Sequence, residues 1–415
     1  MENMKFGPTK SLIVLPFLRN PKSESMYSTS NLLEPIDIEK FKNSYLSKEF
    51  IHFSNSNRKF ALSFNWDDLN EILSRRRFYT DQVRVVKGGQ DIDFESIFSF
   101  RTDNKNPNQK IAYLNNVGIN RLMNDGCTLI VHAVEELMEN IAGLVYAIES
   151  LVHEKVQANL YACFGKGQGF DVHWDNHDVF VLQVLGSKDW TVYNPTENKD
   201  CFNYLEKPIW SNVLNQGELL YMPRGYWHEA KSIGPTIHIT FGFTNRRVEH
   251  YIKWVLRELS LNAIFNSDLN NYHTRELKLE VLENIKEVLT KNINESSLEK
   301  YIGITDAKSP ERPYFNFPYV LDGETLPVDS IIVINSSRIQ LKALQTKGDL
   351  VIFNILNRQW KFSLTTKPIL ERLIIKRQLR VSELVKDFAD EELTQGQIIQ
   401  LIKDLLKLGL VRKIK

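Results

Sequence analysis

The sequence contains little cysteine: three residues, Cys127, Cys163 and Cys201, in a chain of 415. They lie far apart, and no Cys-x-x-Cys pair occurs. A disulfide framework and a zinc site built on cysteines are therefore poor interpretations. Sparse, unpaired cysteine is typical of a reducing compartment, so we expect a cytoplasmic location.

The sequence also lacks a long apolar run. A membrane-spanning helix needs about 20 such residues, and no stretch approaches that length. The apolar segment 11–18, SLIVLPFL, is interrupted by Pro16, and no small-residue cleavage motif follows it closely. We expect an early strand or loop there rather than a secretory signal, and no membrane as a partner.

An excess of charge of either sign is missing as well. Lysine and arginine number 52 against 51 aspartates and glutamates, which gives a net charge of +1. This balance argues against binding to nucleic acid or to a membrane surface through bulk charge, although a local patch stays open. Because domains average about 150 residues, we expect two or three of them.

The spacing of apolar residues changes along the chain. From Val134 to Leu151 they recur at helical spacing, which predicts an amphipathic helix. Between residues 156 and 243, short apolar runs such as VQANLYACF, DVFVLQVL, ELLYM and TIHITFGF are separated by Gly, Asn, Pro and Ser. Many short strands with turn signals predict a β-sandwich or barrel.

Helical spacing returns after Arg247, over 248–265 and 275–293. The apolar stripes of these helices fit either dimerisation or packing on the barrel. The segment 309–318, SPERPYFNFP, is rich in proline and aromatic residues and is typical of a linker. The tail predicts a hairpin over 348–363, helices over 367–378, 381–389 and 394–409, and a last strand at 411–415, an order that resembles a winged-helix domain.

The residues that point to chemistry are two histidines and a carboxylate. His173 and Asp175 are two positions apart, so on a strand both side chains lie on the same face. His228 follows a turn in GELLYMPRGYWHEA that resembles a cupin motif. Two histidines and one carboxylate leave three positions of a non-heme Fe(II) open, as an oxygenase requires for a chelating co-substrate and O₂.

A His-x-Asp pair alone is a weak signal, because such pairs arise by chance on polar strand faces. Lys188 strengthens it: the residue lies on the next predicted strand, after the Gly186 turn. A lysine inside a barrel is unfavourable unless it meets an anion, which a dicarboxylate would supply. His177 has the same strand parity as His173 and stays open as a substrate contact or a fourth ligand.

The segment ANLYACFGKGQGFDVHWDNHDVFVLQVLGSKDWTVYNP resembles the JmjC-type cupin core of the ribosomal oxygenases. The similarity continues through LNQGELLYMPRGYWHEAKSIGPTIHITFGF and covers about residues 120–245. The resemblance implies an α+β fold with a JmjC/cupin double-stranded β-helix core, flanking helices, a helical dimerisation segment and a C-terminal winged-helix domain. The expected divisions are an N-terminal extension 1–120, a catalytic core 121–247, a dimerisation region 248–308, a linker 309–330 and a winged-helix-like domain 331–415.

The same resemblance implies the site residues. His173, Asp175 and His228 would hold Fe(II), and Lys188 would bind the distal carboxylate of 2-oxoglutarate. Asn159, Tyr161, His238 and Thr240 would line the co-substrate pocket, although Asn159 could simply satisfy a backbone amide and Tyr161 could be core. Trp174 and Phe180 could wall the site or belong to the core, the latter being favoured for Phe180.

The implied activity is hydroxylation of a histidine or arginine side chain in a protein or peptide, with 2-oxoglutarate and O₂ as co-substrates and succinate and CO₂ as products. A ribosomal protein or a precursor peptide is the expected substrate, and a homodimer the expected assembly; nucleic acid is not an expected partner. The segment SYLSKEFIHFS lacks the Trp-x-x-x-Pro-like stretch usual in the family, which leaves the substrate open. Two alternatives are a winged-helix regulator with a ligand-sensing cupin and a metal cupin that is not an oxygenase.

Overall fold

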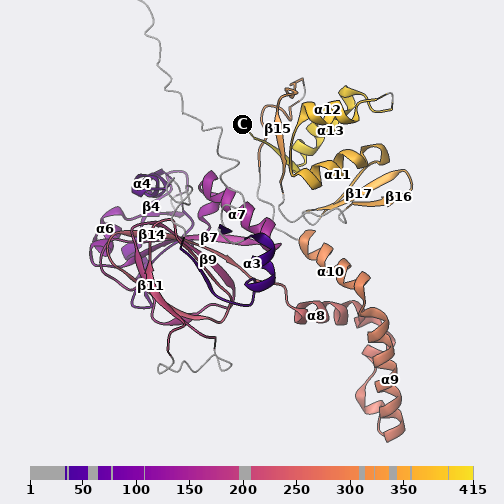
Figure 1. Cartoon of the computed structure of the whole chain (residues 1–415), viewed down its shortest axis with the longest axis horizontal. Helices are drawn as coiled ribbons and strands as arrows, with labels where there is room; N and C mark the ends of the chain where they lie inside the picture. Colours follow the sequence, from indigo (N-terminus) through magenta and orange to yellow (C-terminus); the bar gives the residue numbers. More distant parts are fainter. Residues whose placement is uncertain are drawn as a thin grey trace, which may run out of the picture.

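The computed structural model describes residues 33–414 except 35–36, 55–63, 76–77, 107, 196–206, 308–313, 322, 336–343, 356–357 and 391. The predicted strand or loop at 11–18 and Cys201 lie outside these residues. The described chain forms a β-barrel with helices packed on it, a helical arm and a C-terminal α/β module (Figure 1).

The N-terminal region contains short helices and strands. Before the barrel core lie α3 (Ile38–Ser44), β1 (Ile51–Phe53), α4 (Trp66–Arg75), β2 (Val83–Lys87), β3 (Gln90–Asp91), α5 (Phe94–Ile97), β4 (Phe98–Thr102), β5 (Lys110–Leu114) and α6 (Asn116–Asn124). The Asp37 carboxylate accepts the amide hydrogen of Lys40 and so caps the start of α3. This region therefore completes the barrel as well as preceding it, since β1 pairs with β12 and β2 with β6.

The barrel is built from two antiparallel sheets. Its strands are β6 (Thr128–Val131), β7 (Val156–Cys163), β8 (His173–Trp174), β9 (Asp178–Leu185), β10 (Lys188–Tyr193), β11 (Trp210–Leu214), β12 (Leu219–Met222), β13 (Trp227–Ser232) and β14 (Thr236–Phe243). The large sheet has the order β1-β12-β9-β14-β7-β6-β2-β3, and the small one β11-β10-β13-β8. The predicted run of short strands between 156 and 243 is confirmed.

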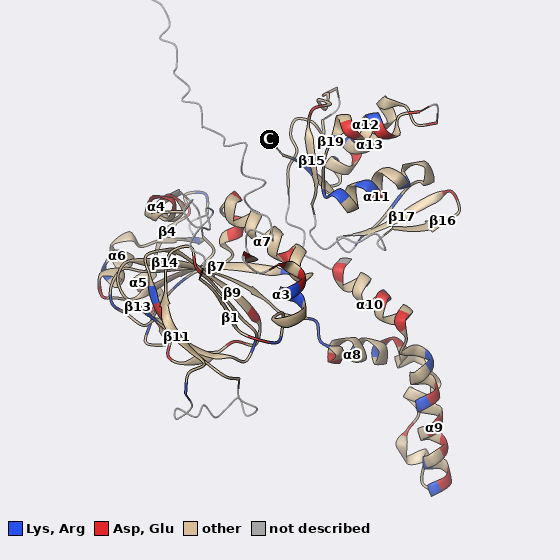
Figure 2. Cartoon of the chain, viewed as in Figure 1, with Lys and Arg blue, Asp and Glu red and all other residues tan. Residues whose placement is uncertain are grey.

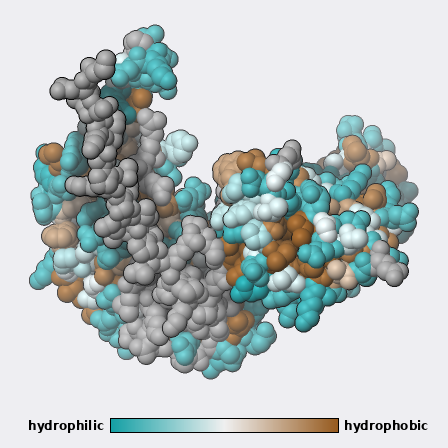
Figure 3. Space-filling model, turned by 90° about the horizontal axis from the view of Figure 1, so that it is seen from above, coloured by the Kyte–Doolittle hydropathy of each residue, from teal (hydrophilic) through white to brown (hydrophobic). Residues whose placement is uncertain are grey.

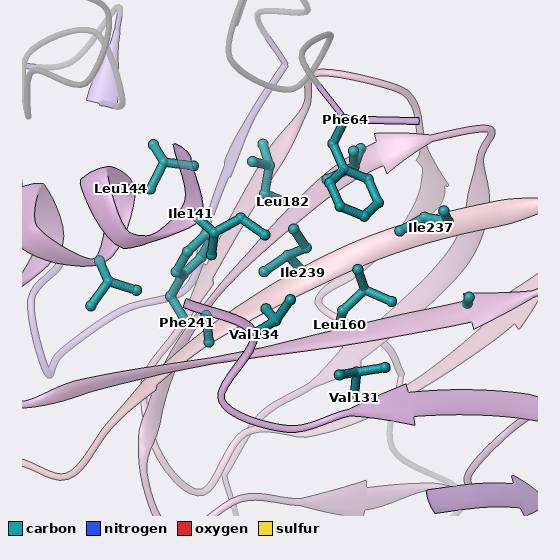
Figure 4. Packing of buried hydrophobic residues seen from close by; sticks show 14 of the residues in the cluster. Phe64, Val131, Val134, Ile141, Leu144, Leu160, Leu182, Ile237, Ile239 and Phe241 are labelled. Carbon is teal, nitrogen blue, oxygen red and sulfur yellow. The ribbon is translucent and has the colours of Figure 1, made fainter. Parts of the chain in front are cut away.

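Alternation along the strands separates two cores. On β9, Val179 and Val181 point between the sheets, where they pack with Trp190 of β10. Phe180 and Leu182 point to the opposite side, into a larger core that α7 covers. Figure 4 shows Ile141 and Leu144 of this helix beside the side chains of the large sheet. The helix-covered side of the sheet is thus filled, and the candidate site residues of β7 and β14 lie on the other side.

The single helix expected over 134–151 is divided in the structure. A 3₁₀ turn, η2 (Val134–Glu136), is followed by an extended residue, Met138, and only then by α7 (Glu139–Val152). The turn is tied to the sheet, because the Glu135 carboxylate accepts a hydrogen bond from the buried amide of Ala158. Satisfying that amide outweighs the helical pattern at these positions.

The arm contains α8 (Val248–Glu258), α9 (Arg275–Asn292) and α10 (Glu295–Ala307). The first predicted helix ends seven residues earlier than expected, at Glu258 instead of residue 265, and 3₁₀ turns follow; Asn262 caps the second of them. Both signs of charge are distributed along α9 (Figure 2). Hydrophobic residues nevertheless reach the surface among hydrophilic ones (Figure 3), including Leu261, Leu279 and Leu282 of the arm.

The C-terminal module confirms the predicted hairpin, three helices and last strand. Its elements are β15 (Ile331–Ile334), β16 (Leu344–Lys347), β17 (Leu350–Ile355), β18 (Arg358–Ser363), α11 (Lys367–Lys376), β19 (Gln378–Arg380), α12 (Val381–Phe388), α13 (Gln395–Lys407) and β20 (Val411–Ile414). The module has its own hydrophobic core; its relation to winged-helix domains stays a prediction. Among the helices of the described ranges, none has both the length and the apolar character of a membrane span.

Candidate active site

The structure brings His173, Asp175 and His228 together at the barrel mouth. One ligand atom from each lies within 4.8 Å of the other two, and His228 Nε2 is 3.7 Å from Asp175 Oδ2. His173 and His228 are cross-strand partners on β8 and β13, which places both imidazoles on the same face. The geometry therefore has the donor set of a two-histidine, one-carboxylate metal site.

Backbone carbonyls orient both imidazoles in the same way. His173 Nδ1 lies 2.8 Å from the carbonyl oxygen of Asp171, and His228 Nδ1 lies 3.1 Å from that of Tyr226. With Nδ1–H donating, each Nε2 is left as the lone-pair atom for a metal. Burial and the neighbouring His173 imidazole lower the pKa of His228 to about 4, so this ligand is neutral and ready to coordinate at pH 7.

His177 does not join the three-residue group found in the described chain. Its imidazole lies directly over Gly242 of β14, where an added Cβ would come within 2.8 Å of Nε2. The open interpretation of His177 as a fourth ligand is therefore not supported, because the ring is held against the next strand.

Lys188 lies inside the barrel with only 4% of its surface exposed. Burial lowers the pKa of its ammonium group to about 8. No described carboxylate forms an ion pair with it, since the ion pairs of the core strands involve other residues. A buried ammonium group without an anionic partner is unfavourable, and this is the property expected of a residue that awaits an anionic ligand.

A closed series of aromatic rings includes two of the candidate ligands, His173 and His228. Each ring contacts the next, with centroid distances between 4.3 and 6.4 Å, and the series closes on itself. Its members are Tyr161, His238, Trp190, His228, His173 and Phe170. Such a wall excludes water and leaves charged groups in a low-dielectric space. Phe170 and Trp190 were missed from the sequence, although the parity of Trp190 with Lys188 on β10 was a signal.

Several polar atoms at this wall lack a hydrogen-bond partner in the part of the chain that is described. They are Trp190 Nε1, His238 Nδ1 and Ser232 Oγ. Ser232 is the cross-strand partner of Lys188. Burial, and then the charge of Lys188, hold the pKa of His238 well below its usual value. Buried polar atoms normally have partners, so these three atoms are available to a polar molecule in this space.

Asn159 and Tyr161 lie on β7 and point to the same face as His238 and Thr240 of β14, their cross-strand partners in reverse order. Asn159 Oδ1 accepts the amide hydrogen of Ala133 at 3.3 Å, which is the structural role weighed for it above. Thr240 Oγ1 donates to the Asn159 carbonyl oxygen at 3.5 Å. Burial first, and then Asp175, raise the pKa of Tyr161 to about 12, so its phenol keeps its proton.

Two suggested wall residues lie elsewhere. Phe180 packs against Phe41 and Tyr221 in the core on the far side of β9. Trp174 is the cross-strand partner of Trp227, and the pleat places this pair on the face opposite His173 and His228. Neither side chain therefore walls the site.

Comparison with known proteins agrees with this geometry. The family model of the JmjC domain matches residues 136–251. A bifunctional lysine-specific demethylase and histidyl-hydroxylase NO66 from Dictyostelium discoideum is 26% identical over 224 residues, covering 51% of this chain and 41% of the relative. The NO66 protein of Drosophila melanogaster is 34% identical over 128 residues, or 28% of this chain and 20% of the relative. The chain thus spans less than half the length of these curated relatives.

Solved structures share the fold over nearly the whole chain. The ribosomal oxygenase YcfD from Escherichia coli in complex with cobalt and 2-oxoglutarate matches with a TM-score of 0.55 and 17% identity, covering 92% of this chain and 99% of that one. The same protein with cobalt and succinic acid gives a TM-score of 0.59 at 16% identity, with the same coverage. Residues 136–251 thus match the JmjC domain, and the chain shares the fold of these solved structures.

Proposed function

We propose that the protein is an Fe(II)- and 2-oxoglutarate-dependent oxygenase that hydroxylates a side chain of a protein or peptide. The observation that carries the proposal is the combination of two histidines and one carboxylate that converge with a buried lysine that has no ion-pair partner among the described residues. A metal site alone fits many cupins. The lysine specifies a second, anionic molecule beside the metal.

The residues present fit both groups. His173, Asp175 and His228 would hold Fe(II), and the Asp175 carboxylate offsets one of its two charges. Lys188 would pair with the distal carboxylate of 2-oxoglutarate, and Ser232 and His238 offer further polar atoms beside it. When bound, the iron and its co-substrate supply the oxidising chemistry, with succinate and CO₂ as products.

The protein contributes placement and exclusion of water. The carbonyls of Asp171 and Tyr226 hold the two imidazoles in one tautomer. Tyr161 remains a phenol and can donate a hydrogen bond into the pocket, since its pKa is raised to about 12. We infer that Asn159 and Thr240 fix the strand that presents Tyr161, because their oxygens are engaged with the backbone of β7 and its neighbour.

The substrate we infer is a histidine or arginine side chain of a ribosomal protein or of a precursor peptide. The relatives support this class: one is named a histidyl-hydroxylase and lysine-specific demethylase, and the other a ribosomal oxygenase. Mass spectrometry of a peptide library after turnover distinguishes hydroxylation from demethylation, since hydroxylation adds one oxygen atom whereas demethylation removes a methyl group.

The first experiment is anaerobic titration of 2-oxoglutarate into the Fe(II)-loaded protein, followed by the visible metal-to-ligand charge-transfer band. We expect a band in the wild type and in Asp171→Ala, which keeps the carbonyl that orients His173. The band should be absent in Asp175→Ala. Bound metal without a band would overturn the proposal in favour of a non-oxygenase cupin or a ligand-sensing regulator.

We also propose that the chain forms a homodimer through the arm. Leucines of this region are largely exposed, with Leu261 93%, Leu279 55% and Leu282 50% accessible. Apolar side chains gathered on an extended arm are typical of an interaction surface. Light scattering coupled to size-exclusion chromatography should give twice the chain mass, and Leu279→Glu with Leu282→Glu should give the mass of one chain.

A further inference from the structure

Asp178 is a buried carboxylate that is not one of the candidate ligands. It begins β9, three residues after Asp175, and its side chain lies on the far side of the strand from the site. Its surface is fully buried, with 0% exposed. Since an ionised carboxylate inside a protein is unfavourable without strong hydrogen bonds, its partners reveal its role.

Three donors from three separate segments converge on this carboxylate. Tyr221 Oη of β12 donates to Oδ2 at 2.6 Å, and Ser47 Oγ, just after α3, donates to the same oxygen at 3.1 Å. The backbone amide of Arg224 donates to Oδ1 at 3.0 Å. The two oxygens therefore contact different parts of the fold. Oδ2 accepts hydrogen bonds from β12 and from the segment after α3, and Oδ1 accepts one from the turn that leads into β13.

That turn controls the position of His228. Arg224 precedes the histidine by four residues, and the next amide, Gly225 N, donates to the carbonyl oxygen of Asp175 at 2.9 Å. Two successive amides of the turn are thus bonded to the segment that carries Asp175. The β8–β13 ladder itself consists of two residue pairs, so these bonds add the restraint that so short a ladder lacks.

We propose that Asp178 is a positioning residue for the metal site: through Oδ1 it sets the distance between His228 and the pair His173 and Asp175. This inference rests on the proposed function, since it assumes that the three residues hold a metal. Asp178 then has a role beyond stabilising the fold, because Oδ1 bonds to the turn before His228 whereas Oδ2 bonds to β12 and to the segment after α3.

The test compares variants that alter all the hydrogen bonds of the Asp178 carboxylate with a variant that removes one bond at Oδ2 alone. Asp178→Ala removes all three hydrogen bonds, Asp178→Asn weakens them, and Tyr221→Phe removes a donor to Oδ2 while leaving the Arg224 amide in place. The probe is Co(II), titrated into the metal-free full-length protein and followed by its visible d–d absorption, with thermal unfolding of each metal-free variant measured in parallel.

We expect Asp178→Ala to weaken Co(II) binding about 10- to 100-fold and to change the shape of the d–d spectrum, with Asp178→Asn between it and the wild type. Tyr221→Phe should lower the unfolding temperature yet bind Co(II) with an unchanged spectrum. If Asp178→Ala does not fold, the Asp178→Asn and Tyr221→Phe pair decides.

Two results would overturn the inference: a folded Asp178 variant that binds Co(II) like the wild type, or a Tyr221→Phe protein as impaired in metal binding as Asp178→Asn. Failure of the wild type to bind Co(II) is a different outcome. It would contradict the proposed function itself and with it the premise of this inference.

Discussion

Two basic residues of this protein, one partly buried and one fully buried, have opposite surroundings. Arg246, between β14 and α8, donates to Glu154 at 3.0 Å, to Asp306 at 2.7 Å and to the His153 carbonyl oxygen at 2.8 Å. Burial alone would lower its pKa, but Asp306 and Glu154 outweigh burial and raise it. Lys188, inside the barrel, has no such carboxylate among the described residues, and burial lowers its pKa to about 8.

The difference separates a cation with a structural role from one that we propose binds a ligand. Arg246 joins the end of the barrel to α10 of the arm and leaves none of its nitrogens idle. We expect Lys188 to destabilise the ligand-free protein, because its ammonium group is buried and no described carboxylate compensates its charge. A protein keeps such a residue when binding supplies the missing partner, and the surrounding unpaired atoms of Ser232 and His238 agree with that interpretation.

The largest loss of activity is expected from variants of the candidate metal ligands, because 2-oxoglutarate bound at Lys188 would not react without the metal. His173→Ala or Asp175→Ala should abolish Fe(II)-dependent conversion of 2-oxoglutarate to succinate, because each removes one of three ligand atoms. Circular dichroism should show an intact fold. Succinate release by either variant at the wild-type rate would mean that the metal lies elsewhere.

The structural half of the comparison is tested by Arg246→Ala. We expect the free energy of unfolding, measured by urea denaturation, to fall by about 3 kcal/mol, since the change leaves Glu154 and Asp306 partly buried without their cation. Lys253→Ala is the matched control: it breaks an exposed pair with Glu249 on α8 and should leave the stability nearly unchanged. Equal losses in both variants would contradict the contrast.

The ligand-binding half is tested by Lys188→Met, which removes the charge and keeps an apolar stem. The dissociation constant of 2-oxoglutarate should rise roughly 10- to 100-fold, because a charge-assisted hydrogen bond is lost. Stability of the ligand-free protein should stay level or increase, the reverse of Arg246→Ala. The control is Lys231→Ala on β13, whose ammonium is exposed and pairs with Glu229. Unchanged affinity in Lys188→Met would show that the pocket is wrongly assigned.

A smaller effect is expected from pH. The pKa of Lys188 is about 8 in the folded protein, below the ordinary 10.5, so the unfolded chain binds more protons between these values. The stability deficit from this group is therefore complete below pH 8 and is relieved as pH rises toward 10.5. Co-substrate affinity has the opposite trend, with a fall of about tenfold from pH 7 to 9 as the ammonium deprotonates. Lys188→Arg should remove this dependence in calorimetric titrations.

Sequence patterns predicted the strands and the convergence of the three candidate ligands, because both depend on local periodicity. His173 and Asp175 are two residues apart, and His228 follows a recognisable turn, so parity and motif were enough. The strand itself ends at Trp174, yet the ligand atoms still converge. Lys188 was identified by the same alternation.

Features that depend on contacts between distant segments could not be read in this way. The role of Asp178 requires knowing that Ser47, Tyr221 and Arg224 meet at one point, and nothing in the spacing of HWDNHD indicates this. The break before α7 also depends on a contact between distant segments, because the Glu135 carboxylate accepts a hydrogen bond from the amide of Ala158 on β7. Phe180 was the reverse case, an apolar residue for which the simpler interpretation was right.

The two-faced strands of the large sheet determine which kinds of mutation this protein can tolerate. On β14, Ile237, Ile239 and Phe241 belong to the helix-covered core, whereas His238 and Thr240 between them face the pocket. Conservative substitutions on either face leave the other undisturbed. Loss or gain of one residue within β7, β9 or β14 would exchange the faces, placing isoleucine in the pocket and histidine in the core. Related proteins with this barrel can therefore differ by substitutions within these strands, whereas insertions and deletions are expected only in the loops.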